Sequence, residues 1–458
     1  MHEWTEQTER LAARVFAYAE ERLHLRPVPL DGPRSPAELA AAAGPTITPD
    51  GIGGERALEI FADVLAPACI SIDHPRYFSF IPCAPTPAST LFDLVVGASS
   101  IYGGSWLEGA GAVYAENEAL RWLADLAGFP PSAGGVFVQG GTLANVSALV
   151  AARHRAMTSL AAEGRARPAR FAVAASTEAH SSIASAASAM DVELIGVEPD
   201  ADGRLTGPAL AEALERFRAE RPSEMAFAVV ATAGTTNLGI VDDLAGVSAV
   251  AKREGLWLHV DGAYGAAALA APSRRALFDG IETADSFVVD PHKWLFSPFD
   301  CAALVYREPA AAAAAHAQHA SYLEPLRTGE DWSPSDYALH LTRRARGLPF
   351  WFSLASYGTK AYSEAIERTL EVAGYAARRV RELDELELLM DPPLSVVAFR
   401  RAGWEEPDYD EWSSRLLESG TAFVVPTTHQ GKAAIRIAVV NPRSTEADVD
   451  VVLDSLVG

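Results

Sequence analysis

The feature that most constrains the fold is a regular alternation, between residues 134 and 306, of short β-branched runs with alanine-rich stretches. The apolar runs are 136–138, 171–173, 192–197, 227–230, 256–260, 287–289 and 303–306. Such runs are typical of strands buried on both faces, and the stretches between them are typical of helices. The pattern therefore predicts an α/β fold with a mostly parallel seven-stranded sheet that is covered by helices on both faces.

The flanking segments predict two further parts. Residues 3–25 carry an apolar helical face, and Ser35 followed by Glu38 predicts a capped helix that begins at Pro36. After the alternation, a helical pattern over 344–385 precedes three expected strands, at 396–399, 422–425 and 435–439. We therefore expect a helical N-terminal arm (1–85), a large domain (86–345) and a small α+β C-terminal domain (346–458).

The composition disfavours several classes of partner. A formal net charge of -22 makes attraction to nucleic acid or to anionic membranes unfavourable, so a small molecule is the better expectation. Cys69, Cys83 and Cys301 have no paired spacing, which suits a reducing compartment and gives no reason to expect a disulfide scaffold or a metal site. The polar N-terminus and the lack of a long apolar stretch lead us to expect a cytoplasmic protein without a membrane span.

Polar motifs follow three of the predicted strands. Gly140-Gly141-Thr142 comes after 136–138, Asp261 after 257–260, and His292-Lys293 after 287–290. Because the carboxyl ends of parallel strands meet at one edge of a sheet, these residues should lie together in space.

Two of these motifs suit an anionic, ring-shaped ligand. Gly140 and Gly141 allow a phosphate to approach the backbone at the start of a helix, although a tight turn would also explain them. Asp261 could hold a pyridinium nitrogen in its protonated form, and Gly262-Ala263 leaves room for a flat ring. A helix cap or a structural hydrogen bond is the simpler explanation for a lone aspartate.

Lys293 is one of only four lysines, the others being at 252, 360 and 432. It lies between His292 and Trp294, and burial there would lower its pKa and make its amine a nucleophile able to form a Schiff base. The alternative is a lysine whose stem packs while its charge reaches water. His180, after the 171–173 run, could stack on a cofactor ring or could simply cap a helix.

Five segments in this order resemble the aromatic-L-amino-acid decarboxylase family of pyridoxal-phosphate (PLP) enzymes, the group II decarboxylases. They are GVFVQGGTLANVSALVAAR, STEAHSSIASAA, ATAGTTNLGIVDDL, LWLHVDGAYGA and DSFVVDPHKWLFSPFDCA, within a resemblance that runs from about His74 to the C-terminus. HVDxAY together with PHKW makes the resemblance specific.

The resemblance implies a fold of the aspartate-aminotransferase type (fold type I) and a homodimer with active sites at the subunit interface, whose N-terminal arm wraps the partner. It implies PLP as cofactor and decarboxylation of an L-amino acid to the amine and CO₂, with Lys293 as the Schiff-base lysine, Asp261 on the ring nitrogen and His180 stacked on the ring. The implied cofactor-binding residues are Gly141, Thr142, His180, Thr236, Asp261, Ala263, His292 and Lys293.

The chain departs from the family near the expected substrate. Asp290 replaces a frequent asparagine near the phosphate, where its charge would be repelled, and Gly104 replaces an aromatic residue, so we expect a pocket of different shape.

Phe80, Ile81, Cys83 and Phe299 are the expected substrate-binding residues, and they favour an aromatic or bulky apolar amino acid. An acidic substrate would need a cation, and Arg76 is the obvious candidate in this segment.

Three other functions stay open. An aminotransferase would clamp the substrate carboxylate with an arginine such as Arg436, so a large distance between Arg436 and Lys293 would favour decarboxylation. A PLP-binding homologue without turnover is the second. The third is an aldehyde synthase, and it depends on an expected mobile loop at 323–341, where Tyr337 could be the proton donor or an anchor and Pro334 aligns with the family's tyrosine.

Overall fold

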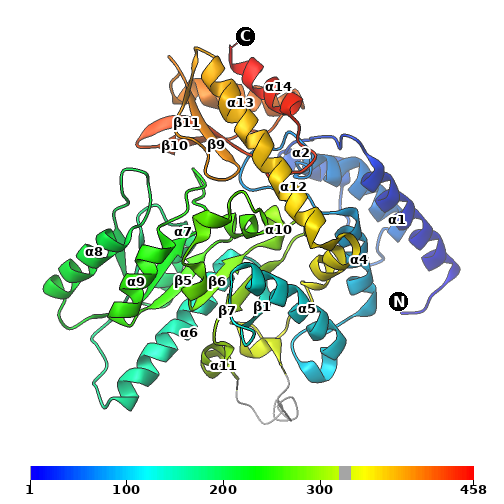
Figure 1. The fold of residues 1–458 in the computed structure, drawn as a ribbon. Helices are drawn as coiled ribbons and strands as arrows, with labels where there is room; N and C mark the ends of the chain where they lie inside the picture. Colours follow the sequence, from blue (N-terminus) through cyan, green and yellow to red (C-terminus); the bar gives the residue numbers. More distant parts are fainter. Residues whose placement is uncertain (1, 319–331, 458) are drawn as a thin grey trace.

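The computed structural model describes residues 2–318 and 332–457, and the predicted α/β unit forms its centre (Figure 1). Its strands are β1 (Gly134–Val138), β2 (Phe171–Ser176), β3 (Glu193–Val197), β4 (Met225–Thr232), β5 (Trp257–Asp261), β6 (Ser286–Val289) and β7 (Ala302–Tyr306). They form one sheet in the order β1-β7-β6-β5-β4-β2-β3. β7 is antiparallel to both neighbours and the other pairs are parallel, so the prediction of a mostly parallel seven-stranded sheet is confirmed. All strands except β7 therefore end at the same edge.

Helices cover both faces of this sheet. One face packs against α6 (Gly141–Ala162), α7 (Ser181–Ala189) and α11 (Pro309–His316). The other packs against α5 (Trp106–Leu126), α8 (Gly207–Glu220), α9 (Leu244–Glu254) and the first half of α12 (Leu348–Glu382). β1 shows why such strands are continuously apolar, because Val136 and Val138 pack on one face while Phe137 packs on the other.

Short elements lie in the connections from β5 to β6 and from β6 to β7. They are the 3₁₀ turns η3 (Gly265–Ala270), η4 (Arg275–Phe278) and η5 (Ile281–Thr283), and the single-turn helix α10 (Pro291–Trp294).

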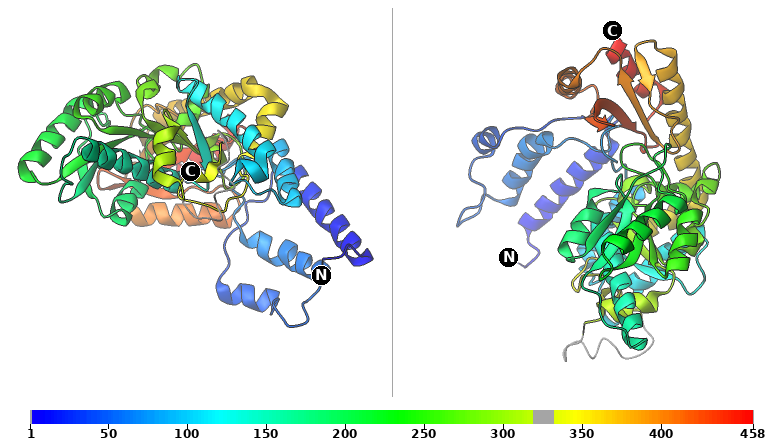
Figure 2. Two further views of the ribbon diagram at one scale, coloured as in Figure 1. Left: turned by 90° about the horizontal axis from the view of Figure 1, so that it is seen from below. Right: turned by 90° about the vertical axis from the view of Figure 1, so that its left-hand side faces the viewer.

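The N-terminal segment is helical, as its sequence predicts. It contains α1 (Glu6–His24), α2 (Pro36–Ala43), α3 (Gly54–Ile60) with the turns η1 (Phe61–Leu65) and η2 (Ala66–Ala68), and α4 (Pro87–Ser99). The predicted cap at Ser35 is present, because the Ser35 side chain accepts from Glu38 N while the Glu38 side chain accepts from Ser35 N. The first three helices project away from the body of the protein, whereas α4 packs against α12 (Figure 2).

A second, four-stranded antiparallel sheet follows α12. Its order is β10-β11-β9-β8, with bounds β8 (Leu386–Leu388), β9 (Val396–Arg401), β10 (Pro426–His429) and β11 (Lys432–Ala438). The helices α13 (Glu406–Glu418) and α14 (Glu446–Val457) pack on it. The domain boundaries expected from the sequence stay a prediction. Within the described residues, no helix has the length and apolarity needed to cross a membrane.

The prediction of a strand at 422–425 is wrong, because the backbone of this segment forms its hydrogen bonds with residues 76–79. Phe423 N donates to Arg76 O, Phe423 O accepts from Phe78 N, and Val425 N donates to the Ser79 hydroxyl. Residues 76–79 thus pair with this segment in the place of a sheet neighbour, and β10 begins only at Pro426.

Candidate active site

A cavity of about 430 Å³ lies at the edge of the large sheet where the parallel strands end. Eleven residues expected from the sequence line it: Phe80, Ile81, Gly141, Thr142, His180, Thr236, Asp261, Ala263, His292, Lys293 and Phe299. They come from positions as far apart as 80 and 299, and the strand order brings them together. Cys83 and Tyr337 are the two expected site residues that do not line this cavity.

The start of α6 forms a cradle for an anion. A Cβ added at Gly141 would lie 3.0 Å from the Ala263 Cβ and 3.2 Å from an Asp290 oxygen, so only glycine leaves the approach open. The first turn of a helix also presents N–H groups that lack intrahelical partners. Asp290 Oδ2 accepts from Gly141 N at 3.3 Å, and a carboxylate thus already contacts this helix terminus. The negative charge of Asp290 therefore lies at the position where a phosphate would approach the helix.

Lys293 lies on α10 with its amine 2.9 Å from Asp290 Oδ2. The sequence predicts that burial lowers the pKa of this lysine, and that prediction is wrong. Burial does pull the pKa down, but the Asp290 carboxylate, helped by Asp261, outweighs it and raises the pKa of Lys293 above its ordinary value. The amine is thus held as an ammonium group until Asp290 is neutralised or displaced.

Asp261 and His180 approach the same space from different elements. Asp261 ends β5 and is 6% exposed, with Oδ1 accepting from Ala263 N and Oδ2 accepting from Asn145 Nδ2 at 2.8 Å. His180 is the N-cap of α7, and its Nδ1 accepts from Ser182 N. The cap expected as the simpler explanation of His180 is therefore present, yet the exposed ring also lines the cavity.

His292 is a fixed, neutral wall of the site. Its Nδ1 accepts from Cys301 N at 3.0 Å, and burial lowers its pKa. The ring centre lies 5.0 Å from that of Phe299. His292 Nε2 faces Asp290 Oδ2 at 3.7 Å, so the imidazole, Lys293 and Gly141 all converge on one carboxylate.

Two residues that line the cavity, Asn145 and Arg436, make contacts that the sequence did not predict. Asn145 was missed, although it lies one helical turn after Gly141 and contacts Asp261 directly. Arg436 is buried, lines the same cavity as Lys293, and donates to Phe80 O at 3.1 Å. A large distance between Arg436 and Lys293 would have favoured decarboxylation over transamination, but both residues line the same cavity.

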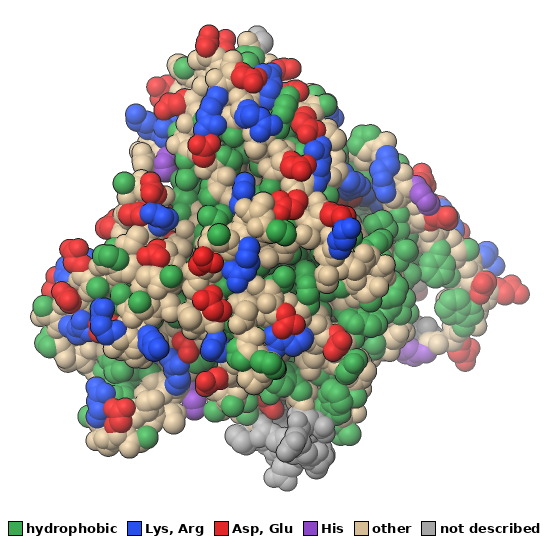
Figure 3. Space-filling model, in the orientation of Figure 1, with side chains coloured by type: hydrophobic (Ala, Val, Ile, Leu, Met, Phe, Trp, Pro, Cys, Tyr) green, Lys and Arg blue, Asp and Glu red, His purple; other side chains and the backbone are tan. Residues whose placement is uncertain are grey.

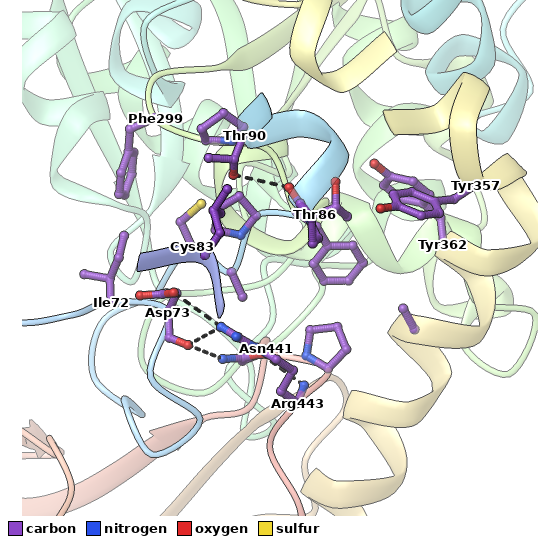
Figure 4. Close-up of a pocket in the computed structure, with 18 of the residues that line it drawn as sticks. Ile72, Asp73, Cys83, Thr86, Thr90, Phe299, Tyr357, Tyr362, Asn441 and Arg443 are labelled. Atoms are coloured by element: carbon purple, nitrogen blue, oxygen red, sulfur yellow. Dashed lines mark hydrogen bonds and ion pairs between the residues drawn. The ribbon is translucent and has the colours of Figure 1, made fainter. Parts of the chain in front are cut away.

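Cys83 belongs to a second, larger cavity of about 680 Å³ beside the first (Figure 4). Its thiol donates to Ser297 O and is buried, so it is not part of the wall formed by Phe80 and Ile81. Phe299 lines both cavities. The expected substrate-binding residues are therefore divided between two spaces.

The expected effect of Gly104 on the shape of the pocket stays a prediction, and the structure shows what surrounds this residue. A Cβ at Gly104 would lie 2.4 Å from the Tyr102 hydroxyl, which donates to Leu341 O. The Tyr102 ring thus fills the space that a larger side chain at position 104 would need.

The expected loop at 323–341 lies partly outside the described residues, which resume at 332. Tyr337 stacks on Trp332 with ring centres 4.0 Å apart, and burial raises its pKa to about 12. These contacts are those of an anchor. Just beyond it, Arg343 forms a fully buried ion pair with Glu116 of α5.

The residues present fit PLP. The cradle at Gly141 suits a phosphate, Asp261 suits a pyridinium nitrogen, and Lys293 offers an amine to an aldehyde. Asp290 Oδ1 is buried and receives no hydrogen bond from the described residues, so beside the cradle there is an acceptor that still lacks a donor.

Comparison with known proteins agrees with this geometry. The family model described as "Pyridoxal-dependent decarboxylase conserved domain" matches residues 52–402. The aromatic-L-amino-acid decarboxylase of Bacillus atrophaeus is 29% identical over 392 residues, which cover 82% of this chain and 79% of that protein. The L-2,4-diaminobutyrate decarboxylase of Rhizobium meliloti (strain 1021) is 31% identical over 395 residues, covering 84% and 78%. The structure of Oryza sativa TDC with PLP and tryptamine superposes with a TM-score of 0.90 at 25% identity, over 100% of this chain and 99% of that one.

Proposed function

The chain belongs to the pyridoxal-dependent decarboxylase family and is a PLP-dependent amino-acid decarboxylase, and we propose that the residues around Lys293 are its catalytic site. One observation carries this proposal. A helix N-terminus, the Asp261 carboxylate, the His180 ring and the Lys293 amine all line a single cavity. When bound, PLP supplies an aldehyde that condenses with an amine and a ring that accepts the electron pair left by CO₂.

Each residue has a distinct task in this proposal. Gly141 and Thr142 hold the phosphate, Thr236 and Ala263 complete the shell, and His180 covers the face of the ring. Asp261 holds the ring nitrogen protonated, which keeps the ring able to accept electrons. Lys293 tethers the cofactor, and the Asp290 oxygen at 2.9 Å is the nearest acceptor for the proton that its ammonium group must lose. His292 and Phe299 form one side of the cavity.

The substrate is proposed to be an aromatic or bulky apolar L-amino acid. Phe80, Ile81 and Phe299 give the cavity an apolar wall. Arg76, the cation expected for an acidic substrate, does not line the cavity and lies 4.0 Å from Asp448. Arg436 does line it, but one of its N–H groups is engaged by Phe80 O. If glutamate were the best substrate in a panel, Arg436 would be its partner and the apolar proposal would fail.

The direct test is incubation of the protein with PLP and single amino acids, with CO₂ and amine measured together. Amine and CO₂ in equal amounts support the proposal. Keto acid with retained carboxylate would identify an aminotransferase, and cofactor binding without any product would identify a non-catalytic homologue. The Lys293→Ala variant controls for uncatalysed reaction.

An aldehyde synthase is a second candidate. Tyr337 packs against Trp332 outside the cavity, and Pro334 stands at the position where the family has its loop tyrosine. Among the described residues, the loop therefore brings no phenol into this chain's own cavity. Release of aldehyde, ammonia and hydrogen peroxide with consumption of O₂, in place of amine, would identify this activity.

A homodimer is proposed from the surface. Leu91, Leu94 and Val95 are about half exposed on one face of α4, and Leu107 and Tyr114 are more exposed on α5. Figure 3 shows hydrophobic side chains, in green, gathered at the right, where Figure 1 places α4 and the N-terminal helices. Such patches mark protein interfaces. Light scattering should give twice the chain mass, and Leu94→Glu should shift it toward the monomer.

The proposed location is the cytoplasm. Cys69, Cys83 and Cys301 are all free thiols, and two of them are buried. Free buried thiols are typical of reducing compartments. Fractionation of the source cells with antibody detection tests this proposal.

A further inference from the structure

A continuous chain of buried hydrogen bonds lies behind Asp261. His259 precedes Asp261 by two residues on β5, so both side chains are on the same face of the strand. His259 is 0% exposed, and its Nε2 lies 2.9 Å from Asn145 Oδ1. Asn145 is 1% exposed, and its Nδ2 lies 2.8 Å from Asp261 Oδ2. One amide group therefore joins the imidazole to the carboxylate.

The polarity of this chain is fixed by its ends. Trp257 Nε1 can only donate, and it donates to Ser286 Oγ at 2.8 Å. The Ser286 hydroxyl can then donate to His259 Nδ1, also at 2.8 Å. At the other end the Asp261 carboxylate accepts, so Asn145 must present Nδ2 to it and Oδ1 to His259 Nε2–H. Every donor points toward Asp261, an arrangement in which each bond strengthens the next.

The imidazole is suited to this role because it is neutral. Burial lowers the pKa of His259 to about 4, although Asp261 acts in the opposite direction. A neutral ring with its proton on Nε2 leaves Nδ1 free to accept from Ser286, as the chain requires.

The same amide also reaches His180. The second N–H of Asn145 points to Ser182 Oγ at 2.9 Å, and Ser182 Oγ lies 2.9 Å from His180 Nδ1. Because His180 Nδ1 also accepts from Ser182 N, it is an acceptor, and the Ser182 hydroxyl must be the donor to it. The two N–H groups of Asn145 are thus divided between the paths to Asp261 and His180.

We propose that Asn145, oriented by His259, is the positioning residue that fixes both Asp261 and His180 toward the ring of the cofactor. Neither Asn145 nor His259 reacts. Asn145 holds the carboxylate at the edge of the ring and, through Ser182, the imidazole at its face. This inference rests on the ring-contacting roles proposed above for Asp261 and His180.

The first test needs no cofactor and no variant. Imidazole ¹⁵N chemical shifts of the cofactor-free protein should show His259 as the neutral tautomer protonated on Nε2. A His259 protonated on Nδ1 would reverse the order of donors and would overturn the proposal.

The second test separates hydrogen bonding from packing. His259→Gln keeps an N–H donor near the position of Nε2, whereas His259→Leu has similar bulk and no donor. Asn145→Asp keeps the shape but removes both N–H groups and places a second carboxylate beside Asp261. Asn441→Asp is the matched control, because Asn441 is 2% exposed, close to the 1% of Asn145, and donates to Asp73 O outside the cavity that contains Lys293.

PLP affinity and the ¹⁵N shift of PLP labelled at its ring nitrogen are the readouts. His259→Leu and Asn145→Asp should bind PLP roughly tenfold to a hundredfold more weakly, the range expected for a lost hydrogen bond to an ionised group. In these two variants the ¹⁵N shift of the PLP ring nitrogen should move toward the value of an unprotonated pyridine. In His259→Gln and Asn441→Asp, both the PLP affinity and this shift should stay near those of the wild type.

Equal affinity and an unchanged ring-nitrogen shift in His259→Leu and His259→Gln would overturn the positioning role. Failure of the wild-type protein to bind PLP would instead overturn the proposed site. The two failures are therefore distinguishable.

Discussion

Replacing Glu116 with leucine tests the ion pair that anchors the chain after residues 319–331. The Glu116 and Arg343 side chains are 3% and 1% exposed, and two bonds of 2.7 and 2.8 Å join them. Glu116 Oε1 also accepts from Gly347 N at 2.8 Å, just before α12 begins. Glu116→Leu leaves the Arg343 charge buried with no carboxylate beside it and only Gly103 O still accepting from it, which costs about 3–5 kcal/mol. Against a total stability of roughly 5–15 kcal/mol, that loss is large.

The companion variants decide whether charge or packing is responsible. Arg343→Met alone strands the Glu116 carboxylate and should cost a similar amount. The double variant removes both charges and should lose less stability than either single variant, because no uncompensated charge remains. Urea unfolding followed by tryptophan fluorescence measures all three. If the two single losses simply add in the double variant, the reasoning about a stranded buried charge is refuted.

Four other outcomes follow from the site. Lys293→Ala should lose the visible absorbance of bound PLP and all turnover while the circular dichroism spectrum stays unchanged. Asp290 raises the pKa of Lys293, so the stabilisation that this ion pair gives the cofactor-free protein is fully present below the ordinary lysine pKa and is lost as pH rises through the raised pKa. The rate of PLP capture, followed by absorbance, should therefore increase with pH. Asp290→Asn should shift that rate profile to lower pH. Tyr337→Phe should leave the product ratio unchanged, because Tyr337 stacks on Trp332, and a rise in aldehyde would contradict the anchor role. The lowered pKa of His259 means that its contribution to stability is present above pH 6.5 and is lost as pH falls toward about 4, so His259→Gln should flatten the urea-unfolding profile in that window.

The parts of the site that were predictable lie at strand ends. Asp261 and Lys293 follow apolar runs whose parallel arrangement brings their ends to one edge, and that rule needs only the hydrophobic pattern. His259 was within reach of the same reasoning, since two residues apart on a strand means the same face. Asn145 could not be predicted in this way, because its partners Asp261, His259 and Ser182 lie on other elements and only tertiary packing brings them to it.

Other misses had the same origin. The pKa of Lys293 depends on a carboxylate three residues away whose orientation is set by the α6 terminus, and burial alone gave the wrong direction. The segment at 422–425 has the composition of a strand, but residues 76–79 take its backbone hydrogen bonds. Cys83 is near Ile81 in sequence and yet faces a different cavity. Local pattern predicts which elements form, and tertiary packing decides what they meet.

The hydrogen bond from Arg436 to Phe80 O spans 356 residues, and it has a consequence for how the protein is made. At about 5–20 residues per second, the ribosome needs roughly 20–70 s to reach Arg436 after it has added Phe80. During that time Lys293, Asp261 and the Gly141 cradle can already be folded, while the apolar wall at Phe80 still lacks its anchor. A nascent chain stopped before Arg436 would therefore have most of the polar groups proposed to hold PLP, but an incompletely anchored wall for the substrate. Completion of the pocket therefore has to wait until Arg436 has been added to the chain.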